Sequence, residues 1–168
     1  MTDLAFSKDT REFLRLLSLH RVRYLLVGGM AVIYHGYPRL TGDYDFFFEA
    51  TRANARRLYG ALRQFWAGTI PFVDRVEDLL EKGVIIQFGT RPNRIDLINS
   101  ITGVSFKEAW KQRIRESLKI EGRLLSIDII GLDDLIKNKK ALVRVKDLDD
   151  LRYLEAVAER YKEKTGKV

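Results

Sequence analysis

The chain has 168 residues, of which 46% are hydrophobic and 32% charged, and its formal net charge is +7. This composition is typical of a globular protein, so we expect a single domain over residues 1–168 and no contact with a membrane. The absence of cysteine excludes thiolate catalysis and thiolate zinc sites, and it favours a cytoplasmic location. The basic charge would attract RNA or a nucleoside triphosphate, although a solvated basic surface would give the same composition.

The first hundred residues predict short strands alternating with helices. Apolar residues at helical spacing predict a first helix over 6–19, with Ser7 or Thr10 as its N-cap. Strands are predicted near 24–27, 43–48, 84–89 and 94–98, helices over 30–37 and 51–65, and a short helical turn at 77–81. The expected fold class is therefore α/β (α+β), with a small mixed sheet and helices packed on it.

Residues 101–168 predict a mostly helical C-terminal part. Ser105 and Glu108 have the spacing of a capping box, so we expect a helix over 105–117. The other elements expected here are a hairpin over 118–130 that turns at 121–123, helices over 132–143 and 147–161, and a frayed tail from Lys162.

Two aspartates lie two residues apart on the strand predicted over 43–48. Successive side chains of a strand point to opposite faces, so Asp43 and Asp45 share one face. Aspartate is depleted in strands, and two carboxylates about 6.5–7 Å apart along a strand can converge on Mg²⁺. Asp96 shares a strand face with Arg94 and is a third candidate ligand, although it could simply pair with an arginine.

Gly28 and Gly29 follow the first predicted strand and precede a helix. Glycine lets the backbone approach a ligand closely, and a helix N-terminus offers free N–H groups to a phosphate. Because any strand-to-helix turn can use glycine, the glycine pair indicates phosphate binding only in combination with the carboxylates at Asp43 and Asp45. A phosphate cradle beside a metal-binding carboxylate pair indicates phosphoryl or nucleotidyl transfer.

At these residues the chain resembles the nucleotidyltransferase superfamily related to DNA polymerase β. Its hallmark is a Gly-Gly or Gly-Ser pair at a strand-to-helix turn, followed by Asp-x-Asp or Asp-x-Glu and by a later third carboxylate. Gly28–Gly29, Asp43-x-Asp45 and Asp96 correspond to these parts, and Thr41 precedes the first aspartate as in many members. Weaker matches resemble uncharacterised bacterial and archaeal members and toxins of the abortive-infection type. They lie at Phe88-Gly89, Ile101-Thr-Gly103, Phe106, Trp110, Lys139 and Asp150.

The resemblance implies an enzyme that transfers a nucleoside monophosphate from an NTP to an acceptor hydroxyl. Asp43 and Asp45 would hold two cations, Mg²⁺ or Mn²⁺, and Asp96 would ligate the second and accept the proton of the hydroxyl. The acceptor would be an RNA end, a protein or a small molecule. A toxin-like member would also have an antitoxin as partner.

Basic side chains near the end of the helix over 132–143 are candidates for binding the triphosphate. They are Lys137, Lys139, Lys140 and Arg144. Helical spacing places Lys137, Lys140 and Arg144 on one face, whereas the resemblance favours Lys139. A solvated helix face is the alternative interpretation.

Two further candidates for nucleotide contact precede the carboxylate pair in the sequence. Arg39 could reach a phosphate or be solvated, and Thr41 could contact the nucleotide or only brace its turn. Asp147, Asp149 and Asp150 are expected to cap the last helix and to pair with the basic residues rather than to bind metal.

Two other classes of function are compatible with this sequence. One is a non-catalytic relative that binds nucleotide or RNA, and the other is a structural or interaction domain. The three candidate carboxylates argue against the first class, because a degenerate copy has no physical need for them. The spacing of the glycine pair to Asp43 and Asp45 argues against the second.

Overall fold

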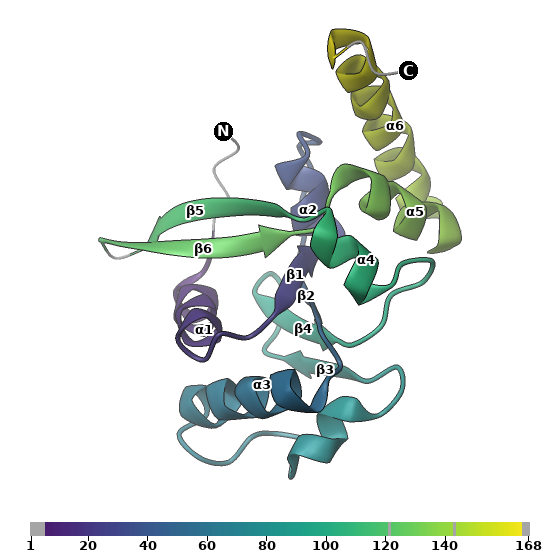
Figure 1. Cartoon of the computed structure of the whole chain (residues 1–168). Helices are drawn as coiled ribbons and strands as arrows, with labels where there is room; N and C mark the ends of the chain where they lie inside the picture. The colour runs from purple at the N-terminus through teal and green to yellow at the C-terminus, as the bar shows by residue number, and fades with distance from the viewer. Residues whose placement is uncertain (1–5, 121, 143, 166–168) are drawn as a thin grey trace.

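The computed structural model describes residues 6–120, 122–142 and 144–165 (Figure 1). These residues form helices and one mixed sheet, which confirms the predicted α/β (α+β) fold class. The elements are α1 (Lys8–Leu19), β1 (Tyr24–Val27), α2 (Gly28–Tyr34), β2 (Asp43–Phe48), α3 (Arg52–Phe65), the short 3₁₀ helix η1 (Val76–Leu80), β3 (Ile85–Phe88), β4 (Arg94–Ile98), α4 (Phe106–Lys111), β5 (Ile114–Ile120), β6 (Arg123–Ile129), α5 (Leu132–Leu142) and α6 (Val145–Thr165). Within the described ranges, no helix combines the length and the apolar character that crossing a bilayer requires.

The sheet has six strands in the described residues, in the order β3–β4–β2–β1–β6–β5. β2 pairs antiparallel with β1 and parallel with β4, so it lies near the middle of the sheet. The four strands predicted near 24–27, 43–48, 84–89 and 94–98 are confirmed. The β5–β6 hairpin adds two more, and Figure 1 shows it extending away from the other strands.

The alternation of side chains along β2 separates the two faces of the sheet. Phe46 points to one face, where its ring packs edge-on against Phe13 of α1 at a centroid distance of 5.5 Å. Phe13 also contacts Phe65 of α3, so α1 and α3 cover this face. Phe47 points to the other face and packs against Phe106 of α4 at 5.1 Å. Burying each phenylalanine contributes about 1.5–3 kcal/mol, so the apolar end of β2 is anchored on both faces.

The helix predicted over 30–37 begins and ends earlier than expected. α2 starts at Gly28, whose φ of +63° lets the chain turn from β1 into the helix without a loop. It ends at Tyr34, with His35 as its C-cap. The His35 ring is also within hydrogen-bond distance, 2.9 Å, of the Ile130 carbonyl oxygen. Burial lowers the pKa of His35, which favours the neutral imidazole at this cap.

Two expectations for the C-terminal part were wrong. The helix predicted over 105–117 ends at Lys111, and residues 114–120 form β5 instead. The physical reason is the strict alternation of partly buried and exposed residues along β5, which fits a strand that covers one side of its partner β6. The tail predicted to fray from Lys162 continues α6 to Thr165. The predicted hairpin turn at Glu121 and the helix end at Val143 fall partly outside the described residues.

Candidate active site

The register of the sheet brings carboxylates from two strands together. β2 and β4 run parallel with Asp45 beside Asp96, so both side chains point to the same face. Gln87 of β3 lies opposite Asp96, and Val27 of β1 lies opposite Asp45. These four residues form a row across the sheet, on the face not covered by α1 and α3.

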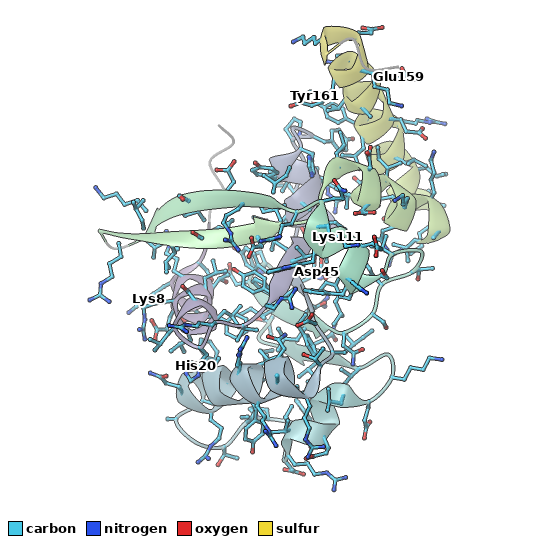
Figure 2. All side chains as sticks on the ribbon, in the orientation of Figure 1. Lys8, His20, Asp45, Lys111, Glu159 and Tyr161 are labelled. Carbon is cyan, nitrogen blue, oxygen red and sulfur yellow. The ribbon has the colours of Figure 1, made fainter. Side chains whose placement is uncertain are left out.

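This row is the floor of an open cleft of about 590 Å³. Its walls are the start of α2, the strand ends that carry Asp43 and Arg94, residues 100–102, and the junction of α5 with α6. Figure 2 shows Asp45 near the centre of the molecule, whereas the labelled Lys8, His20 and Glu159 lie toward its outside. The glycine pair and the two aspartates of β2 that the sequence singles out all line this cleft.

The glycine pair permits the close approach of three chain segments at one end of the cleft. A Cβ atom at Gly28 would overlap the Asp45 carboxylate oxygen Oδ2, so only glycine leaves room for that side chain. A Cβ atom at Gly29 would lie 2.5 Å from Thr41 Oγ1 and 3.0 Å from Arg39 Nη2. Val27, the N-cap of α2, makes no side-chain hydrogen bond to the first N–H groups of that helix. The first N–H groups of α2 are therefore without a side-chain cap and can donate to an anion in the cleft.

Asp45 has no hydrogen bond or ion pair with the residues that the structure describes. Burial, reinforced by the charges of Asp43 and Asp96, raises the pKa of Asp45 to about 7, although Lys139 and Arg94 act in the opposite direction. A carboxylate in this environment is stabilised either by binding a proton or by a nearby cation.

Asp43 and Asp96 are both paired with Arg94. Arg94 Nη2 lies 2.8 Å from Asp43 Oδ2 and 2.7 Å from Asp96 Oδ2, and Arg94 Nε lies 2.7 Å from Asp96 Oδ1. Gln87 donates a further hydrogen bond to Asp96 at 3.0 Å, and Arg91 lies 3.3 Å from Asp43 Oδ2. The guanidinium of Arg94 thus lies between two of the three predicted metal ligands.

The donor types in the cleft fit a divalent cation, whereas their present arrangement holds an arginine. Asp43, Asp45 and Asp96 supply the carboxylate oxygens that Mg²⁺ prefers, on one face of one sheet. Among the described residues, however, no group of three or more His, Cys, Asp or Glu side chains is arranged to hold a metal ion. Arg94 is the cation that stands between these carboxylates, so metal binding requires its side chain to move.

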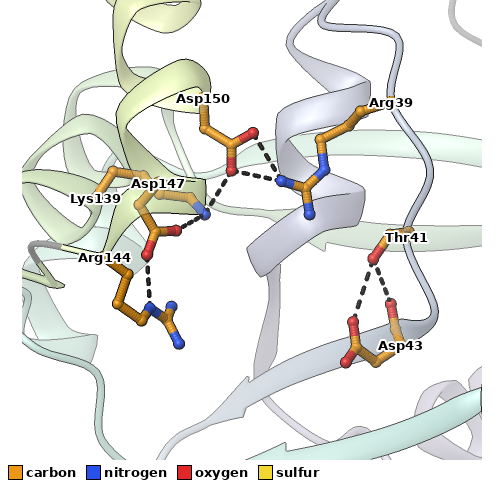
Figure 3. A network of polar contacts seen from close by, with 7 residues as sticks. All are labelled: Arg39, Thr41, Asp43, Lys139, Arg144, Asp147 and Asp150. Atoms are coloured by element: carbon orange, nitrogen blue, oxygen red, sulfur yellow. Dashed lines mark hydrogen bonds and ion pairs between the residues drawn. The ribbon is translucent and has the colours of Figure 1, made fainter.

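Beside the carboxylates, five charged side chains form a chain of alternating sign (Figure 3). Arg144 Nε lies 2.6 Å from one oxygen of Asp147, and Lys139 Nζ lies 2.6 Å from the other. Lys139 also lies 2.8 Å from Asp150, which binds Arg39 Nη1 through both oxygens at 2.7 Å. Three cations and two anions leave an excess of one positive charge at the wall of the cleft.

The centre of this network is buried. Asp147 and Asp150 are both 1% exposed, and Lys139 is 5% exposed. Burial opposes ionisation of Asp147, but hydrogen bonds from Lys139 and Arg144 hold its pKa below the ordinary value. Arg39 is held by Asp150 through one terminal nitrogen, so its other, Nη2, is directed toward Gly29 and the cleft. The predicted pairing of these aspartates with the basic residues is thus present for Asp147 and Asp150, whereas Asp149 is exposed.

The structure separates the four basic candidates of the C-terminal part into two pairs. Lys139 and Arg144 line the cleft. Lys137 is 64% exposed and pairs with Asp134, and Lys140 is 55% exposed and pairs with Glu155. Lys137 and Lys140 therefore lie on a face of α5 that does not meet the cleft, whereas Arg144 lies beyond the end of α5 and reaches the cleft from the junction with α6.

The other sequence candidates lie around the carboxylates. The Thr41 hydroxyl donates to the carbonyl and carboxylate oxygens of Asp43 at 3.4 and 3.2 Å, so it braces the entry to β2. Sequence reasoning did not single out Gln87 or Arg91. Gln87 is found only through the antiparallel register of β3 with β4, and nothing in the local sequence directs Arg91 toward Asp43.

No protein-family model matches the chain, and no curated protein is significantly similar to it. A proposal about function therefore depends on the residues of the cleft themselves.

Proposed function

We propose that the chain is a nucleotidyltransferase, which moves a nucleoside monophosphate from an NTP to an acceptor hydroxyl. One observation carries the proposal: Asp45 and Asp96 stand side by side at the floor of a cleft that opens beside Gly28 and Gly29. Asp43 precedes Asp45 on the same strand face, so the three carboxylates face one space. This combination supports nucleotidyl transfer better than any single motif does.

The chain's own groups suit each part of a triphosphate substrate. The uncapped N–H groups at Gly28 and Gly29 can donate to phosphate oxygens, and Arg39 Nη2 lies beside them. Lys139, fixed by two buried aspartates, adds a positive charge at the wall of the cleft and offsets charge that develops on the leaving pyrophosphate.

Asp43, Asp45 and Asp96 are the residues that would hold Mg²⁺ or Mn²⁺. When bound, such cations neutralise phosphate charge and lower the pKa of the acceptor hydroxyl. Asp96 is the candidate acceptor of the hydroxyl proton. Its Oδ1 is now bonded to Arg94 Nε, so it can take a proton at that atom only after the arginine has moved.

The test is calorimetric titration of ATP, GTP, CTP and UTP in the presence of Mg²⁺. We expect wild-type protein to bind at least one of them and the Asp43→Ala/Asp45→Ala variant to bind it at least about tenfold more weakly, which is about 1.4 kcal/mol. The matched control is Asp149→Ala, because Asp149 is exposed on α6. Equal metal-dependent binding by wild type and the double variant would contradict the proposal.

The acceptor class is separated by a second experiment. An NTP labelled in the α-phosphate is incubated with cell extract and the protein, and the products are treated with ribonuclease or protease. Loss of the labelled product with ribonuclease identifies an RNA acceptor, and loss with protease identifies a protein. Label that resists both treatments and stays in the low-mass fraction indicates a small molecule.

The arginine pairs favour one alternative, a non-catalytic nucleotide- or RNA-binding relative. Asp43 and Asp96 are neutralised by Arg94 without any metal, and the same cleft could bind phosphates through its basic wall alone. This alternative predicts that nucleotide affinity is unchanged by EDTA and unaffected by Asp45→Asn. The nucleotidyltransferase proposal predicts loss of affinity in both cases.

A further inference from the structure

We propose that Arg94 is an exchangeable counterion, which holds Asp43 and Asp96 in the metal-free protein and gives way when a divalent cation binds. This inference rests on the proposed function, because it concerns the same carboxylates. It adds a role for a residue that takes no part in binding metal or transferring the nucleotide. It also explains how three carboxylates can gather in a folded chain before any metal arrives.

The position of Arg94 follows from the sheet register. Arg94 lies two residues before Asp96 on β4, so both side chains point to the cleft. The parallel pairing places Arg94 directly beside Asp43 of β2. A guanidinium at this position reaches both carboxylates, and the three contacts of 2.7–2.8 Å have the length of charge-assisted hydrogen bonds.

Exchange does not require the core to open. The side chains of Arg94 and Asp43 are 22% and 20% exposed, and both line the cleft. The backbone register of β2 with β4 extends over five residue pairs, from Asp43 to Phe47, so the two strands stay joined without the arginine. Arg94 can therefore leave the carboxylates by rotation of its side chain into the cleft.

The charge balance favours exchange over simple addition of a cation. With Arg94 in place, a divalent cation near Asp43 and Asp96 would face a positive charge in contact with both ligands. With Arg94 moved, the cation meets three carboxylates, including Asp45, which has no partner among the described residues. Metal binding must therefore break the arginine contacts, and their loss weakens the observed metal affinity.

The experiment measures Mn²⁺ binding to nucleotide-free protein by calorimetry. Arg94→Gln is expected to bind Mn²⁺ at least about tenfold more tightly than wild type, because no guanidinium has to be displaced. Arg91→Gln is the matched control, since Arg91 is 65% exposed and contacts Asp43 once, at 3.3 Å. Its Mn²⁺ affinity is expected to stay within about twofold of wild type.

Arg94→Lys keeps the positive charge but cannot span two carboxylates with a planar fork. It is expected to bind Mn²⁺ with an affinity between those of wild type and Arg94→Gln, and it decides the question if the glutamine variant does not fold. A second readout is the melting temperature, which Mn²⁺ should raise more in either variant than in wild type, relative to EDTA.

The outcomes separate the two proposals. Wild-type protein that binds Mn²⁺ as tightly as the Arg94 variants, or more tightly, overturns the exchange but leaves the proposed function intact. Failure of wild type and of every Arg94 variant to bind Mn²⁺ overturns both. Tighter binding by the variants, lost again when Asp45→Asn is added, supports both.

Discussion

Replacing Asp45 with asparagine is expected to stabilise the metal-free protein, although the residue lies at the centre of the candidate active site. The Asp45 carboxylate is largely buried, stands beside Asp96, and has no hydrogen bond or ion pair with the described residues. Ionising it in the folded state is therefore unfavourable. Asparagine has the same shape and no charge, so the repulsion disappears.

The magnitude follows from the pKa of Asp45, which burial and the neighbouring carboxylates raise from 3.8 to about 7. Because the folded state holds this proton more tightly than the unfolded state, the contribution of Asp45 to stability falls as the pH rises from about 4 to about 7. Above pH 7 the free energy of unfolding that ionised Asp45 removes is constant, at about 4 kcal/mol. The increase in the free energy of unfolding caused by Asp45→Asn should accordingly be about 2–3 kcal/mol larger at pH 8 than at pH 5.

The assay is urea denaturation at pH 5, 6, 7 and 8 in the presence of EDTA, with free energies of unfolding from linear extrapolation. Asp149→Asn is the control, because Asp149 is exposed and its variant should show no such trend. Asp96→Asn should instead lower the free energy of unfolding, since it leaves Arg94 with one partner fewer. An Asp45→Asn variant that is less stable than wild type at pH 8, or whose gain is the same at pH 5 and pH 8, would refute the reasoning.

Three other substitutions test close packing and buried polar contacts by the same urea measurement. Gly28→Ala should cost about 2–4 kcal/mol, because φ is +63° and the new Cβ overlaps a carboxylate; a neutral effect would contradict the close contact between this glycine and β2. Lys139→Met should lower the free energy of unfolding by about 3–5 kcal/mol, because it leaves two buried aspartates short of a partner. The control Lys140→Met, at an exposed lysine, should change stability far less, and equal effects of the two would count against the buried network. Tyr34→Phe should cost about 1–2 kcal/mol through loss of its hydrogen bond to a glutamate of β5, and an unchanged unfolding midpoint would show that this bond contributes nothing.

Local patterns predicted those parts of the fold that depend on neighbouring residues. The alternation along β2 places Asp43 and Asp45 on one face, and the serine and threonine caps mark where helices begin. Ser7 accepts a hydrogen bond from the Thr10 N–H, and Thr51 caps α3 in the same way. Such signals are short-range, so they are visible in the sequence.

The features that were missed depend on contacts between distant segments. Ser105 caps α4 by accepting a hydrogen bond from the Glu108 N–H, but this signal marks only the start of a helix, and pairing with β6 places residues 114–120 in a strand. The bridging position of Arg94 depends on the parallel register of β2 and β4. Spacing on α5 defines a basic face but cannot say which face packs inward, and Lys139 is buried because α6 supplies two aspartates to pair with it.

The most direct test of nucleotidyl transfer follows two phosphates of one substrate. The protein is incubated with Mg²⁺ and cell extract, once with an NTP labelled in the α-phosphate and once with one labelled in the γ-phosphate. The proposal predicts that the α-label enters the acceptor, that the γ-label leaves in pyrophosphate, and that Asp45→Asn, which should remain folded, abolishes both. Transfer of the γ-label to the acceptor, or equal incorporation by wild type and Asp45→Asn, would contradict it.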